Sequence, residues 1–214
     1  MVPALLGFAA AATLLILAPG PDTMLVMRNA LRGGRRVGVC TAAGTLTGLV
    51  SWAVAAALGL SSLLAASRVG YDLLRVVGAL YLIWLGVTTL WRRHPTGVDG
   101  SGPAPEPGRP AAAAPRLGRG YINGVISNVC NPKIGVFFVA FLPGFIPSGV
   151  SVGEFSFLLG LWFAVETGIW LAAIVWMVVR GVGWLHRPGV QRKLERITGL
   201  VLIGFGVRLA TETR

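Results

Sequence analysis

Three charged side chains stand within or beside the long apolar runs of this sequence and are its strongest candidates for chemistry. They are Asp22, Lys133 and Glu166. A charged group in such a setting is costly to withdraw from water, so it normally meets an opposite charge or serves an ion or substrate pathway. The three residues therefore indicate a site that binds or conducts a polar solute, and we assign no catalytic residue.

Asp22 closes a segment that should break its helix, Pro19-Gly20-Pro21-Asp22. Proline removes a helical hydrogen bond and clashes with the preceding turn, so two prolines around a glycine predict a full interruption. Pro21 suits the first position of a new half-helix. Asp22 then lies in the first turn, where the positive end of the helix dipole favours a carboxylate. The alternative is a structural kink that Asp22 merely caps.

A second break, Asn131-Pro132-Lys133, repeats this design with the opposite charge. Asn131 can cap a new half-helix and Pro132 can start it. Lys133 then lies at the positive end of the dipole, where a cation is disfavoured. We therefore expect an acidic partner for Lys133, with Asp22 as the symmetric candidate and Glu166 as the other. The alternative, a lysine that reaches the membrane interface, requires Lys133 to lie less deep than its position in the run indicates.

Glu166 keeps three interpretations at this stage. It could carry a coupling proton, contact the amine of a substrate, or form a structural ion pair with Lys133. Cys40 and Cys130 lie in apolar surroundings, which favours packing thiols over reactive ones. No nucleotide-binding motif is present, and we expect neither a metal nor a cofactor.

The elements that must position these residues are membrane-spanning helices. Of the 214 residues, 54% are hydrophobic and 13% are charged, whereas soluble domains carry about a quarter charged residues. The apolar runs approach or exceed the length of a spanning helix and lack the alternation of a membrane barrel. We therefore predict an all-α integral membrane protein with six spans. The runs are residues 2–18, 37–64, 76–90, 134–147, 155–179 and 197–207.

The net charge of +11 comes from the loops and not from a nucleic-acid site, because no RNA- or DNA-binding motif accompanies it. Basic residues are in excess in the first, third and fifth predicted loops, the first of which begins at Arg28. The positive-inside rule places these loops in the cytoplasm and both termini outside. No Lys or Arg precedes Arg28, so we interpret the N-terminal run as a mature span and not as a signal peptide.

The two halves of the chain resemble each other. Residues 82–87 and 202–207 match at four of six positions, and the two proline breaks fall at corresponding places. Chance similarity of apolar stretches would not explain the matching breaks. Each half holds three spans, so the second half must be inverted, as in many secondary transporters. We predict repeats at residues 1–91 and 120–214, with spans 1 and 4 broken, joined by a flexible cytoplasmic linker at 92–119.

These motifs resemble the lysine exporter / homoserine–threonine resistance (LysE/RhtB) family of bacterial amino-acid exporters. The resemblance is strong over spans 1 to 4 and weak over spans 5 and 6. Gly144 stands where the family usually has Gln, and Glu166 is not part of its pattern. The matching stretches are residues 19–23, 28–38, 44 and 48, 78–86, 128–133, and 137, 138 and 141–143.

The resemblance implies proton-coupled export of amino acids or related small metabolites across the inner membrane, by proteins that are usually dimers and are not enzymes. We expect the half-helix starts at Pro21 and Pro132, with Lys133, to attract a substrate carboxylate. Asp22, with Glu166 as a second candidate, would contact the amine or carry the proton. The candidate site residues are Pro19, Gly20, Pro21, Asp22, Asn128, Asn131, Pro132, Lys133 and Glu166.

Two other functions compete with amino-acid export. One is a membrane thiol–disulfide electron carrier that uses Cys40 and Cys130. The other is an ion-efflux protein or channel on the same scaffold. The sequence does not name the transported solute.

Overall fold

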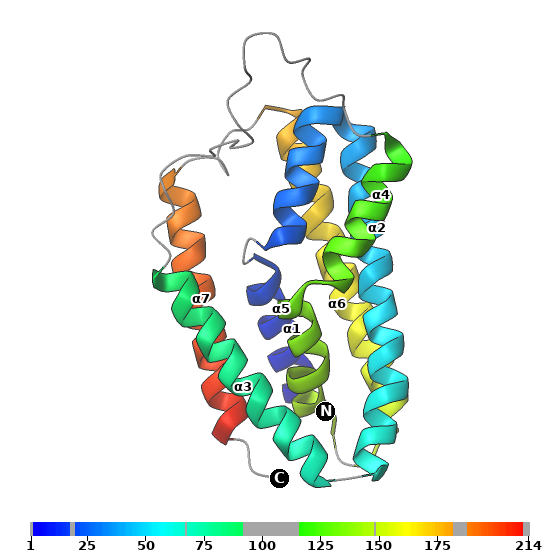
Figure 1. Cartoon of the computed structure of the whole chain (residues 1–214), viewed down its shortest axis with the longest axis vertical. Coiled ribbons are helices and arrows are strands. Elements are labelled where there is room, and N and C mark those ends of the chain that lie inside the picture. The colour runs from blue at the N-terminus through cyan, green and yellow to red at the C-terminus, as the bar shows by residue number, and fades with distance from the viewer. Residues whose placement is uncertain are drawn as a thin grey trace.

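The computed structural model describes residues 2–17, 20–66, 68–91, 116–147, 149–181 and 188–211, and every regular element within these ranges is a helix. The all-α prediction is confirmed (Figure 1). The predicted linker at 92–119 lies mostly outside the described residues. The elements are α1 (Val2–Leu17), α2 (Pro21–Ala66), α3 (Arg68–Trp91), α4 (Leu117–Val129), α5 (Pro132–Val136), the π-helical turn η1 (Phe137–Phe141), the 3-10 turn η2 (Leu142–Phe145), α6 (Val152–Val179) and α7 (Pro188–Thr211).

The first predicted break separates α1 from α2. α1 ends at Leu17, and α2 begins at Pro21 with Asp22 in its first turn. Proline is well suited to this first position because its missing N–H would have no helical partner there. Pro19 lies outside the described residues.

The second predicted break separates α4 from α5. α4 ends at Val129 and α5 begins at Pro132. The helical segments on the two sides of the break are bent by 48° relative to each other. Asn131 caps α5, because its side-chain oxygen accepts a hydrogen bond of 3.1 Å from the backbone N–H of Lys133. The local capping signal in the sequence thus acts as predicted.

Our expectation for the first loop was wrong. We placed a loop from Arg28 onward, but α2 continues through this segment as a helix and turns back at Gly34 (Figure 1). Gly34 has φ 72° and ψ −174°, a conformation that glycine adopts without a steric penalty. Arg28 and Arg32, the arginines that precede Gly34 in this helix, are exposed, and their long side chains can reach water from within a helix. We call residues 21–33 the first leg of α2 and residues 35–66 its second leg.

Glycines bring the second leg of α2 into close contact with α4. α2 packs most extensively against α4 and α6, while α3 pairs with α7. A Cβ at Gly44 would collide with the backbone of Tyr121, and one at Gly124 with the backbone of Thr41. These two positions therefore allow the helix backbones to touch. The contact fixes α4, and with it the residues that precede the second break.

An aromatic cluster packs around η1 and joins it to neighbouring helices. The ring of Phe137 lies 4.6 Å from that of Phe163 in α6, and Phe141 lies 4.5 Å from Phe205 in α7. Phe8 of α1 contacts Phe137 at 6.0 Å. Aromatic pairs at such separations add to the stabilisation from burial alone. The cluster thereby ties α1, α6 and α7 to the segment that follows the second break.

The helices have the length and surface of a multi-pass membrane protein. Residues Pro21–Gly59 of α2, which include its turn at Gly34, and all of α6 are long and apolar enough to cross a membrane. The bent pair Leu117–Val129 and Pro132–Phe145 would make a third span. Large apolar side chains cover the outer faces; Ile169 of α6, for example, is 68% exposed. Such a surface suits contact with lipid.

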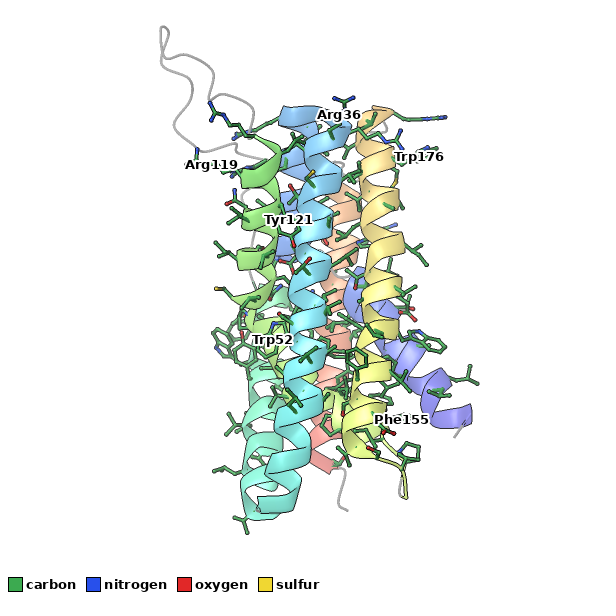
Figure 2. All side chains as sticks on the ribbon, turned by 90° about the vertical axis from the view of Figure 1, so that its right-hand side faces the viewer. Arg36, Trp52, Arg119, Tyr121, Phe155 and Trp176 are labelled. Carbon is green, nitrogen blue, oxygen red and sulfur yellow. The ribbon has the colours of Figure 1, made fainter. Side chains whose placement is uncertain are left out.

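Basic residues gather at one end of the bundle. Figure 2 shows Arg36 and Arg119 at this end and Phe155 near the opposite end. In Figure 1, α1 begins and α7 ends toward the lower end of the bundle, which is the end near which Figure 2 shows Phe155. The exposed basic residues at the first end are Arg35, Arg36, Arg116, Arg119 and Arg180.

Candidate functional site

The carboxylate of Asp22 is the centre of a hydrogen-bonded cluster where the two helix breaks meet. Asp22 is buried, with 8% of its surface exposed. Its Oδ1 accepts a hydrogen bond from Ser127 Oγ at 2.6 Å. Its Oδ2 accepts from Asn128 Nδ2 and Asn131 Nδ2, both at 3.0 Å. Three side-chain donors and the start of a helix are the surroundings that stabilise a buried negative charge.

Lys133 makes the reciprocal contact, from the second break back to the first. Its Nζ donates to the backbone oxygen of Leu15 at 3.3 Å. Leu15 lies in the last turn of α1, where carbonyl groups lack helical partners and carry the negative end of the dipole. Asp22, the acid of the first break, therefore bonds to side chains at the second break, and Lys133, the base of the second break, bonds to the end of α1 at the first.

The structure distinguishes between the two acids proposed as partners of Lys133. Asp22 and Lys133 line one cavity. Glu166 instead accepts hydrogen bonds from Thr13 Oγ1 at 3.2 Å and from Trp162 Nε1. It thus joins α6 to α1, and the alternative ion pair between the described side chains of Glu166 and Lys133 is not formed.

The cavity shared by Asp22 and Lys133 has a volume of about 30 Å³, which is enough for about one water molecule. α6 supplies two of its polar walls, Thr167 and Trp170. We did not expect either residue from the sequence. The signal was present, because Phe163, Thr167 and Trp170 follow one another at helical spacing and so share a face.

A larger groove of about 430 Å³ lies beside this cavity, between the first leg of α2 and α4. Ser127, which donates to Asp22, lines it, and so does Arg28. Because Arg28 follows Pro21 by about two helical turns, the groove extends from the helix breaks toward the basic end of the bundle. Its volume lies in the usual range for pockets that bind small molecules.

The remaining candidates lie as follows. Cys40 is half-buried on the second leg of α2 and Cys130 is exposed at the turn after α4, and both are free thiols. Among the described residues, no group of three His, Cys, Asp or Glu side chains has the proximity of a metal site. Glu166 is apart from the Asp22 cluster, and Pro132 is exposed at the start of α5. The predicted residues that line the cavity are Gly20, Asp22, Asn128, Asn131 and Lys133.

Comparison with known proteins gives consistent matches along nearly the whole chain. Residues 13–213 match the model of the LysE type translocator family. The uncharacterized membrane protein YrhP of Bacillus subtilis is 30% identical over 206 residues, 95% of this chain and 97% of the relative. The leucine efflux protein of Salmonella typhimurium is 27% identical over 206 residues, 94% of this chain and 91% of the relative. The homoserine/homoserine lactone efflux protein of the same organism is 28% identical over 200 residues, 93% and 92% of the two chains. No solved structure matches.

Proposed function

The chain belongs to the family of LysE type translocators, and from this premise we propose that it exports amino acids or related small metabolites across the cytoplasmic membrane. As a member of that family it is a transporter and not an enzyme. Two of its relatives are named as efflux proteins for leucine and for homoserine and its lactone. The observation that carries the proposal is that a buried acid, Asp22, and a partly buried base, Lys133, line one cavity at two broken helices.

Broken helices offer transporters a binding site because they expose backbone donors and acceptors in the middle of the membrane. Here the starts of α2 and α5 meet at one cavity. A substrate ammonium would be attracted by Asp22. Its carboxylate would be attracted by Lys133 and by the N-terminal end of α5.

We propose six spans in two inverted repeats, residues 1–91 and 120–214, joined by the linker at 92–119. α1 with the first leg of α2 forms the first span, the second leg forms the second, and α3 forms the third. α4 with α5, η1 and η2 forms the fourth, and α6 and α7 complete the set. The course of the chain in Figure 1 supports this count, since each of these units traverses much or all of the bundle.

The proposed orientation places the basic end of the bundle in the cytoplasm. The exposed arginines near Gly34, at the start of α4 and at the end of α6 lie at this end, as the positive-inside rule requires for cytoplasmic loops. Both termini then face the outside of the inner membrane. The groove that contains Arg28 and Ser127 extends toward the cytoplasmic end and offers a route by which a substrate approaches the closed cavity.

Coupling to an ion gradient is the simplest energy source, because the sequence has no nucleotide-binding motif. We propose protons as the coupling ion, with Asp22 as the first candidate carrier and Glu166 as the second. We also propose a homodimer, as the family resemblance implies.

The proposal is tested by efflux from cells that lack their own exporters and are preloaded with a dipeptide mixture. Cells that express the chain should release specific amino acids faster than cells with an empty vector. A chain with both Cys40→Ser and Cys130→Ser should retain this efflux, whereas the thiol–disulfide alternative requires that it be inactive. The absence of any exported amino acid from well-expressing cells would refute the proposed function.

A further inference from the structure

We propose that Thr167 and Trp170 of α6 complete the binding site, and that this site recognises the zwitterionic head of a neutral amino acid with an apolar side chain. The inference rests on the proposed function and adds to it a substrate class and two binding residues. Both residues line the cavity that contains Asp22 and Lys133.

The first observation is a set of buried polar atoms without a partner. In the described part of the chain, four buried side-chain atoms form no hydrogen bond: Asn128 Oδ1, Thr167 Oγ1, Trp170 Nε1 and Ser156 Oγ. The first three belong to residues that line the same cavity, and Asn128 is 1% exposed. An unsatisfied buried polar atom is destabilising, so such atoms are rare unless they serve a ligand, water or ion. Their gathering at one cavity indicates that its natural occupant is polar.

The second observation is the division of the polar lining into donors and acceptors. Lys133 Nζ and Trp170 Nε1 can only donate, and the Thr167 hydroxyl can donate as well. The carboxylate of Asp22 and the free Oδ1 of Asn128 can only accept. A ligand with only a positive charge would lie beside the hydrogen-bond donors, and a ligand with only a negative charge would lie beside the carboxylate of Asp22; both contacts are unfavourable. A zwitterion satisfies both sets, with its carboxylate toward the donors and its ammonium toward the acceptors.

The third observation is the apolar remainder of the cavity wall. Among the described residues, Asp22 and Lys133 are the only charged ones that line the cavity, and its other walls are mostly aliphatic and aromatic side chains. A charged substrate side chain would have no partner there, whereas an aliphatic one would be removed from water. The cavity of about 30 Å³ is smaller than an amino acid, so the walls must separate when the substrate enters. The apolar wall is formed by Leu15, Ile16, Leu49, Ile134, Phe163 and Leu171.

The test compares two ligands that differ only in the group that the donors would bind. Purified protein in detergent is titrated with L-leucine and with 3-methylbutylamine, which is the same molecule without its carboxyl group, and the thermal stabilisation gives the affinity for each. Trp170→Phe removes the N–H and keeps the ring, and Thr167→Val removes the hydroxyl and keeps the shape. Each variant should weaken L-leucine about tenfold, as expected for the loss of a hydrogen bond to a charged group, and should leave the affinity for 3-methylbutylamine within about twofold.

Matched controls are Trp176→Phe, on the exposed surface of α6, and Thr47→Val, whose hydroxyl bonds to Tyr121 at 2.9 Å away from the cavity. Neither should change the ratio of the two affinities. Equal weakening of both ligands by Trp170→Phe and Thr167→Val, or no change in either, would overturn the inference while amino-acid binding by the wild type still stood. Tighter binding of L-lysine or L-glutamate than of L-leucine would overturn the apolar assignment. If the wild type bound no amino acid, the proposed function itself would fail.

Discussion

At the scale of the residue, the central feature is a carboxylate with three side-chain donors. Ser127, Asn128 and Asn131 all come from the second broken segment, and all point at Asp22. Prolines and caps act within a few residues of the chain, which is why Pro21, Pro132 and Asn131 could be predicted from the sequence. The donors to Asp22 lie more than 100 residues away from it along the sequence, and no local sequence pattern predicts such a contact.

We predict that Asp22→Asn leaves the protein in the membrane but removes most efflux. The amide would present an NH₂ group to donors that now meet a carboxylate, and the negative charge that we propose attracts the substrate amine would be lost. Transport should fall at least about tenfold. Efflux per copy of membrane protein measures this, with Glu154→Gln, an exposed acid at the start of α6, as the control. Normal efflux by the Asp22→Asn protein would contradict the proposed role of Asp22 in transport.

A second prediction concerns the charge pair. Lys133→Met leaves Asp22 without the nearby positive charge. The cost should stay below the about 3–5 kcal/mol typical of a fully buried pair, because Lys133 is only partly buried and Asp22 keeps its three hydrogen-bond donors. Membrane yield and melting temperature should therefore fall. Adding Asp22→Asn should partly restore both, because neither charge is then left alone.

Glu166→Gln is the matched comparison for that rescue, because Glu166 bonds to Thr13 and Trp162 instead. It should not restore the Lys133→Met protein. If Glu166→Gln rescued and Asp22→Asn did not, the charge assignment derived from the shared cavity would be reversed.

At the scale of the element, the structure depends on the close approach of α2 and α4. We predict that Gly44→Ala lowers the stability of the protein by about 1–3 kcal/mol, because the new Cβ meets the backbone of Tyr121 and forces the helices apart. Gly59→Ala in the same helix meets nothing within 4 Å and should be neutral. Melting of the two variants in detergent gives the comparison. Equal stability of both would contradict the close contact.

The error in the first loop also belongs to this scale. A count of apolar residues stops the first span near residue 18 and assigns Arg28 and its neighbours to a loop. The structure continues the helix to Gly34, because exposed arginines near a membrane surface are compatible with a helix. The widening of the fourth span into the π-helical turn Phe137–Phe141 was likewise unpredictable, since it depends on the packing of its aromatic side chains against α6 and α7.

At the scale of the whole molecule, the distribution of basic residues predicts the orientation in the membrane. We predict that a reporter fused after Arg214 is active outside the cytoplasm, and that one inserted in the linker at 92–115 is active inside. The reason is the gathering of arginines at the end of the bundle opposite to the start of α1 and the end of α7. Cytoplasmic activity of the C-terminal fusion in a folded protein would refute either the count of six spans or their orientation.

The central claim is that the chain is a carrier of amino acids, and counterflow in proteoliposomes tests it most directly. Purified protein is reconstituted, the vesicles are loaded with an excess of unlabelled L-leucine or L-homoserine, and a trace of the labelled amino acid is added outside. A carrier exchanges one for the other, so we predict a transient accumulation of label inside above the outside concentration for at least one of the two. Label that only equilibrates, without an overshoot, would indicate a channel, and label that does not enter at all for either amino acid would contradict the account.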